Sequence, residues 1–242
     1  MLFDFLKANS KLNFMLSVKE DISSAYISFL QSDHFPCVAA KAALQRGQTR
    51  TFVAGHMACP RNDQQILEFI YQFVDDYRSS EAAFHSAAVI FEQPENISED
   101  CFEEFMWMRL QSLSNLDATN FPFDERVSLD PNSPDFSFSL KSEAFFIIGL
   151  HPASNRPGRR FQYPALVFNP HAGFEQMRAK NQYEKMKNIV RKKDMAVSGS
   201  INPMLDDFGN SSEAFQYSGK NYSSSWKCPL HIKHGTANHS AA

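Results

Sequence analysis

Apolar residues recur at every third or fourth position in several stretches of the chain, which is the pattern of helices that bury one face. The clearest such stretch is Asn62–Tyr77. A capping box, Ser17-Val-Lys-Glu20, predicts the start of an earlier helix. The same spacing, with residues that start or stop helices, predicts three more: from Pro36–Cys37 to Gly47, behind the cap Ser98, and from about Gly173 to Val190.

Short runs of bulky apolar residues predict buried strands. These runs are Thr49–Ala54, Ala87–Phe91, Phe145–Leu150 and Ala165–Phe168. In one more stretch, Phe136, Phe138 and Leu140 alternate with Ser137 and Ser139, which predicts a half-buried strand. The turn-forming sequence Lys141-Ser-Glu143 would join that strand to the next as a hairpin.

The predicted helices and strands do not follow a regular strand–helix–strand alternation. We therefore expect an α+β fold, with a mainly antiparallel sheet packed by helices, in a single domain over residues 1–230. Prolines and turn formers in residues 116–134 predict a long irregular loop, which could serve as a lid. The last dozen residues, 231–242, are expected to form a disordered tail.

Composition narrows the class of protein. A net charge of −3 gives no basic field for nucleic acid, and no apolar run is long enough to span a membrane. The four cysteines are widely spaced without a CxxC pair, which favours a cytoplasmic protein with reduced thiols. The 23 phenylalanines could line a pocket for a flat apolar ligand, although an ordinary aromatic core explains them more simply.

Cys37 is expected in the first turn of a helix, directly after a proline. There the helix dipole and the free backbone N–H groups would lower the pKa of the thiol. Such a sulfur can be a nucleophile, a redox sensor or an iron ligand, and N–H donors suit heme–thiolate ligation. From the spacing alone, a small buried cysteine that acts as a hydrophobic residue is the more common case.

The loop after Leu150 carries a histidine and three arginines, His151, Arg156, Arg159 and Arg160. Arginine pairs in a bidentate manner with carboxylate or phosphate, so this loop is a candidate anion site, with a solvated basic loop as the alternative. His151 could be an iron ligand, a general base, or a hydrogen-bonded histidine without a chemical role, and the sequence favours the last.

Asp206, Asp207 and Glu213 could clamp a cationic substrate if they are buried, or could serve as turn-forming and capping residues. His171 begins a predicted helix and could belong to its cap. The chain contains no HExxH motif, no convincing two-histidine-one-carboxylate spacing, and no Walker or Rossmann glycine pattern.

Several segments, taken together, resemble the YqcI/YcgG family and, within it, the guanitoxin-type heme-dependent N-hydroxylases. They are Phe35-Pro-Cys37, Gly149-Leu-His-Pro-Ala-Ser-Asn-Arg156 with Arg159-Arg160-Phe161, Leu166-Val-Phe-Asn-Pro-His171 with Phe174-Glu175 and Arg178, Gly199-Ser-Ile-Asn-Pro203, Ser212-Glu-Ala214 with Gln216-Tyr-Ser-Gly219, and Trp226-Lys-Cys-Pro229. Two positions depart from the family pattern: Phe215 stands where arginine is expected, and Gly173 where glutamine is expected.

The resemblance implies a heme b enzyme that hydroxylates a guanidino or amino nitrogen of a small, amino-acid-like substrate of the arginine type. Phe-Pro-Cys is common to divergent branches, so Cys37 is the first candidate for the axial ligand, because a thiolate favours O–O cleavage. His151 is the second candidate, as alternative ligand or on the distal side. Glu213 or Asp206 would hold the guanidinium.

The remaining roles implied by the resemblance concern the rim of the site and the partners. Arg156, Arg159 and Arg160 would pair with heme propionates or the substrate carboxylate, and His171 would lie at the cofactor. An external electron donor or peroxide is required, and a homodimer is left open. The rival functions are a non-catalytic heme or small-molecule sensor or carrier, and a thiol enzyme that uses Cys37 with His151.

Overall fold

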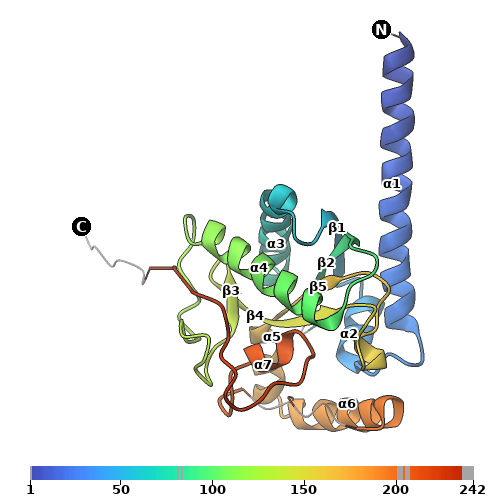
Figure 1. Cartoon of the computed structure of the whole chain (residues 1–242). Helices are drawn as coiled ribbons and strands as arrows, with labels where there is room; N and C mark the ends of the chain where they lie inside the picture. Colours follow the sequence, from blue (N-terminus) through green and yellow to red (C-terminus); the bar gives the residue numbers. More distant parts are fainter. Residues whose placement is uncertain (1, 81, 83, 201–203, 205–207, 236–242) are drawn as a thin grey trace.

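The computed structural model describes residues 2–80, 82, 84–200, 204 and 208–235. The strands form one open sheet, and the helices pack around it (Figure 1). Their bounds are α1 Leu2–Gln31, α2 Val38–Gln45, β1 Thr49–His56, α3 Asp63–Arg78, β2 Ser86–Gln93, α4 Glu99–Asp117, β3 Phe138–Leu140, β4 Glu143–Leu150, β5 Ala165–Pro170, α5 His171–Ala179, α6 Tyr183–Ser198 and α7 Ala214–Tyr217.

The five strands lie in the order β1-β2-β5-β4-β3. β1 runs parallel to β2, and the other three neighbouring pairs are antiparallel. Helix α3 connects the parallel pair, because parallel neighbours need a crossover connection. The predicted α+β class with a mainly antiparallel sheet is therefore confirmed.

The sheet separates two hydrophobic clusters. In β5, Leu166 and Phe168 belong to the larger cluster, whereas Ala165 and Val167 belong to the smaller one on the opposite face. This alternation follows from the two-residue repeat of a strand. Helices α3 and α4 build the larger cluster, and the C-terminal part of α1 builds the smaller one, while the N-terminal part of α1 extends beyond the body of the protein (Figure 1).

Two local predictions are confirmed in detail. Ser98 caps α4 by accepting a hydrogen bond from the backbone N–H of Cys101 at 3.2 Å. The β3–β4 hairpin turns through Lys141 and Ser142, which both have a φ of 53°. Two successive positive φ values match the right-handed twist of the strands on either side.

Two predicted helix boundaries are wrong. Ser17 lies inside α1, which begins near the N-terminus, so the capping box starts no helix. The helix expected from Gly173 to Val190 is divided into α5 and α6, because Asn181 adopts a φ of 55° and ends α5. Asparagine tolerates this left-handed conformation better than most residues, because its short polar side chain can bond locally.

The β3 region is more buried than its alternation predicts. Ser137 and Ser139 are both fully buried, since this edge of the sheet is covered on both faces. Each hydroxyl has a polar partner: Ser137 lies 2.7 Å from the Glu213 carboxyl, and Ser139 accepts the N–H of Asp124 at 3.1 Å. The expectation of a half-buried strand is therefore wrong at these two serines.

The expectation of a disordered tail is wrong for residues 231–235. His234 is buried, and its Nε2 lies 2.9 Å from Asp117 Oδ2 at the end of α4. The same carboxylate accepts hydrogen bonds from Tyr71 and from the backbone of Lys141. Residues 236–242 lie outside the described residues. In residues 116–134, the structure contains no strand or helix beyond the end of α4, as predicted.

Candidate functional site

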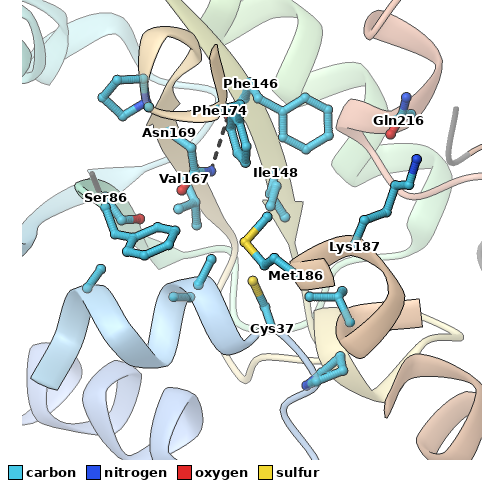
Figure 2. A pocket seen from close by; sticks show the side chains of 18 of the residues that line it. Cys37, Ser86, Phe146, Ile148, Val167, Asn169, Phe174, Met186, Lys187 and Gln216 are labelled. Atoms are coloured by element: carbon cyan, nitrogen blue, oxygen red, sulfur yellow. Dashed lines mark hydrogen bonds between the residues drawn. The ribbon is translucent and has the colours of Figure 1, made fainter. Parts of the chain in front are cut away.

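A cavity of about 270 Å³ lies between α2, the strands β4 and β5, and the helices α5, α6 and α7. Its walls are mostly apolar, and Figure 2 shows the Cys37 sulfur pointing toward Met186 and Ile148, with Phe174 and Phe146 beyond them. Glu213 lines the same cavity. Most small-molecule sites combine apolar walls with a few polar groups in this way.

Cys37 is the N-cap residue of α2, with φ −77° and ψ 104°. The backbone N–H groups of Ala39 and Ala40 at the start of the helix lower the pKa of the thiol, although the sulfur accepts no capping hydrogen bond. Burial has the larger effect and raises that pKa above its usual value. The expected helix-start position is close to correct, but the expected net lowering of the pKa is wrong, because the surroundings of the sulfur are apolar.

The segment that carries Cys37 is held by the loop after β4. A Cβ atom on Gly158 would come within 2.6 Å of Pro36, so only glycine allows this contact without displacement. Tyr26 of α1 also lines the cavity, and burial, followed by the nearby Cys37, raises the pKa of its hydroxyl. The Phe35–Cys37 segment and the loop after β4, which are far apart in sequence, thus meet near the sulfur.

Glu213 immediately precedes α7 and is 6% exposed. Burial raises the pKa of its carboxyl to about 8, although the hydrogen bond with Ser137 and the charge of Arg178 lower it. Its Oε1 lies 3.7 Å from Nε2 of His171 at the start of α5. Burial lowers the pKa of His171 to about 4, so its imidazole is neutral at physiological pH.

The three loop arginines are engaged within the protein. Arg159 donates to the carbonyl oxygens of Gly149, Gln216 and Tyr217, and burial lowers its pKa to about 10. Arg160 donates to the carbonyl oxygen of Ser154 and does not line the cavity. These contacts join the loop to α7 and to itself.

Arg156 lines the cavity but pairs with Asp194 of α6 and donates to the carbonyl oxygen of Ser200 at 2.7 Å. Together with the contacts of Arg159 and Arg160, these bonds make the loop a structural clamp. A ligand anion would have to displace the existing partners of these arginines. The three described arginines therefore do not form the expected anion site with free guanidinium groups.

His151 is fully buried and does not line the cavity. Its ring stacks on Phe102 with centroids 4.3 Å apart, and neither ring nitrogen has a hydrogen-bond partner among the described residues. Burial lowers its pKa to about 4. The structure therefore does not bring His151 together with Cys37, and it also lacks the hydrogen bonds that the sequence favoured.

The other expected site residues are placed as follows. Asp206 and Asp207 lie outside the described residues. Gly173 lines the cavity, whereas Phe215 packs edge-on against Trp226. Sequence reasoning missed Ser137 as the partner of Glu213, because the two are 76 positions apart and no local pattern connects them.

The donor set at the cavity fits a heme in part. Cys37 would hold the iron through its sulfur, close to the backbone N–H groups at the start of α2, and the porphyrin would supply nitrogen ligands of its own. No group of three or more His, Cys, Asp or Glu side chains that could hold a metal ion is found in the described parts of the chain. Of the two expected iron ligands, Cys37 and His151, only Cys37 lines the cavity.

The present volume is the part that does not fit. A porphyrin is larger than a cavity of about 270 Å³. Helix α6 contributes Met186 and Lys187 to the wall and contains no fully buried residue. Binding of heme would require this cavity to widen.

Fold and site together define an α+β protein with a mostly apolar cavity that is lined by the Cys37 thiol and the buried Glu213 carboxyl. A sequence profile of the YqcI/YcgG family matches residues 26–231, so the chain belongs to this family. It is similar to the uncharacterized protein YcgG of Bacillus subtilis (strain 168), with 25% identity over 185 residues that cover 74% of this chain and 72% of the relative. No solved structure matches. Among the described helices, none is long and apolar enough to cross a membrane.

Proposed function

We propose that the protein is a heme-dependent N-oxygenase that hydroxylates a guanidino or amino nitrogen of a small, amino-acid-like substrate. The observation that supports this function is the shared cavity: Cys37, at the N-terminus of α2, lines the same mostly apolar space as the buried carboxyl of Glu213. A thiolate ligand suits oxygen activation, and a buried carboxyl suits a cationic nitrogen group.

Heme, when bound, supplies the oxidising iron, and an external electron donor or peroxide supplies the reducing equivalents or the oxygen. Cys37 would hold the iron, while the N–H groups of Ala39 and Ala40 stabilise its thiolate. Phe146, Phe174 and Ile148 contribute to the apolar walls of the cavity. The clamp formed by Arg159 fixes α7, and with it the position of Glu213.

The thiol enzyme that would pair Cys37 with His151 is not supported, because these side chains do not share the cavity. A non-catalytic heme or small-molecule sensor or carrier uses the same pocket and differs only in the absence of turnover. The experiments below separate it from the enzyme.

The first experiment is a hemin titration of the purified protein, followed by absorption spectroscopy. We expect a Soret band, whose position in the ferrous–CO complex indicates thiolate ligation. Cys37→Ser should abolish the thiolate-type spectrum, whereas the matched control Cys59→Ser, at an exposed cysteine, should keep it. A protein that remains colourless, or a thiolate spectrum that persists in Cys37→Ser, contradicts the proposal.

The second experiment separates an enzyme from a binding protein. L-arginine is incubated with heme-loaded protein and either peroxide or a reductant with oxygen, and the products are analysed by mass spectrometry. An N-oxygenase yields a product with one added oxygen atom. Binding of heme and arginine without any oxygenated product supports the sensor or carrier instead.

A further inference from the structure

One wall of the cavity is built by two buried polar side chains from different elements. Glu213 and His171 are 7% and 8% exposed in their side chains, and Glu213 Oε1 lies 3.7 Å from His171 Nε2. That Nε2 atom has no hydrogen-bond partner among the described residues. A buried polar atom without a partner costs free energy, so this wall lacks a hydrogen-bonding group that a ligand can supply.

The hydrogen bonds around Glu213 have two possible arrangements. Ser137 Oγ lies 2.7 Å from Glu213 Oε2 and 3.0 Å from the carbonyl oxygen of Phe145, but its hydroxyl has only one proton to donate. If Glu213 is protonated, it donates to Ser137, which donates to Phe145. If Glu213 is ionised, Ser137 turns to the carboxylate, and the Tyr217 hydroxyl, 3.5 Å from the same carbonyl, becomes its donor.

In the protonated arrangement the donor to the Phe145 carbonyl is Ser137 at 3.0 Å, and in the ionised arrangement it is Tyr217 at 3.5 Å. The shorter distance favours the protonated arrangement, and the surroundings of the carboxyl agree with it. Burial raises the pKa of the Glu213 carboxyl to about 8, and Glu175 raises it further, against Ser137 and Arg178. The titratable or charged groups that face Glu213 or its neighbour His171 are His171, Glu175 and Arg178 from α5, Asp124 and Arg126 from the loop before β3, Tyr217 from α7, and Lys187 from α6.

We propose that Glu213 and His171 form a receptor for a cationic nitrogen group, and that binding of this cation expels the proton of Glu213 to solvent. The inference deepens the proposed function and rests on it only for the expectation of an arginine-type substrate. A guanidinium or ammonium donates N–H to both Oε1 of Glu213 and Nε2 of His171, the latter in its Nδ1–H tautomer. The buried carboxylate then has the partner charge that a low-dielectric site requires.

The proton balance is simple. The protonated carboxyl and the ligand cation become an ion pair, and one proton leaves to water. Without the ligand, Glu213 remains neutral and the empty site holds no unpaired charge. The site therefore favours cations over neutral isosteres, because only a cation can form the ion pair that stabilises the ionised form of Glu213.

Isothermal titration calorimetry tests this inference on the purified protein, with and without added heme. The probes are agmatine and L-arginine as cations and L-citrulline as a neutral isostere. Titrations in two buffers of different ionisation enthalpy measure proton release. We expect close to one proton released per agmatine at pH 7, since a group with a pKa of about 8 is mostly protonated there. The affinity for agmatine should rise about tenfold per pH unit between pH 6 and 7.5 and level off above pH 8.

Variants assign the effect to the receptor. Glu213→Gln keeps the shape and a hydrogen bond to Ser137, and it should lower agmatine affinity more than tenfold and abolish proton release. The matched control Glu104→Gln removes an exposed carboxylate of α4 that does not line the cavity. It should retain proton release and bind agmatine within about threefold of the wild type.

The wild-type measurements decide the question even if a variant fails to fold. Binding of agmatine with no proton release and no pH dependence overturns the inference, as does equal affinity for citrulline. Absence of any binding also overturns it. These results are distinguishable from failure of the proposed function, because a protein without heme binding can still bind agmatine with proton release, and a heme protein can lack it.

Discussion

Cys37 carries its proton at neutral pH in the heme-free protein, because burial raises the pKa of its thiol more than the backbone N–H groups of Ala39 and Ala40 lower it. Thiolates are the reactive form of cysteine. We therefore expect iodoacetamide to modify Cys37 at least about tenfold more slowly than the exposed Cys59 at pH 7.5. Peptide mass spectrometry after timed alkylation measures both rates.

The alkylation experiment has an internal control, because all four cysteines should react at similar rates in urea. Equal rates for Cys37 and Cys59 in the native protein would show that the sulfur is accessible or ionised. At this scale, the sequence identified Cys37 and Glu213 as candidate site residues. It could not predict the direction of the Cys37 pKa shift, because that depends on apolar side chains from α1, β4 and α6.

The contact between Gly158 and Pro36 joins the arginine-rich loop to the start of α2. Gly158→Ala would place a methyl group 2.6 Å from the proline ring, so the Phe35–Cys37 segment or the loop must shift. We expect a loss of about 1–3 kcal/mol in the free energy of unfolding, as for other overpacked sites. Urea denaturation followed by circular dichroism measures this loss.

A second alanine substitution provides the comparison for Gly158→Ala. A Cβ atom on Gly235 would meet nothing within 4 Å, so Gly235→Ala should leave the stability within about 0.5 kcal/mol of the wild type. If both variants are equally stable, the close contact is not a constraint on the Cys37 segment.

Arg159 is the link between the loop and α7. Arg159→Met removes hydrogen bonds to Gln216 and Tyr217 at 2.8 and 2.9 Å and to Gly149 at 3.3 Å, leaving their carbonyl oxygens without this donor. We expect a destabilisation of about 3 kcal/mol or more. Hydrogen exchange should increase in residues 214–217, and exchange confined to the loop would contradict the link.

Most elements were predictable because their signals are local. Ser98 before an apolar helix and a turn sequence between two strands each act within a few residues. The division between α5 and α6 was missed, since Asn181 lies within an otherwise helical pattern and its left-handed conformation is set by packing. The role of Arg159 was also missed, because three carbonyl groups from two distant elements, β4 and α7, define it.

The stability of the whole protein should have a maximum near pH 6.5. The folded pKa values of His151 and His171, about 4, lie below the usual 6.5, so unfolding takes up protons between pH 4 and 6.5 and stability falls as the pH drops through that range. Glu213, with a folded pKa of about 8, keeps a proton that the unfolded chain releases above pH 4.5. Its contribution is therefore lost as the pH rises toward 8.

Below pH 6.5 the two histidines outweigh the single glutamate, and above it Glu213 acts alone, each group changing the free energy of unfolding by at most about 1.4 kcal/mol per pH unit. Urea denaturation at half-unit steps between pH 5 and 8.5 measures the profile. Glu213→Gln should flatten the decline above pH 6.5 and steepen the rise below it, because Glu213 opposes the histidines there. A wild-type profile that still rises between pH 6.5 and 8 would contradict the prediction.

At the scale of the whole molecule, the α+β class followed from the order of apolar patterns, and the order of strands did not. The parallel pairing of β1 with β2 depends on the α3 crossover, and the position of β5 between β2 and β4 depends on contacts across the sheet. The shared cavity of Cys37 and Glu213 is likewise a product of tertiary packing.

The cavity and the larger hydrophobic cluster lie on opposite faces of the sheet. Among the described residues, no buried member of the larger hydrophobic cluster lines the cavity. Substitutions in the lining that keep the contacts of Gly158 and Arg159 therefore leave the larger cluster unchanged. Relatives that differ on the cavity face can therefore keep the packing of the opposite face, so one fold is compatible with cavities of different shape and polarity.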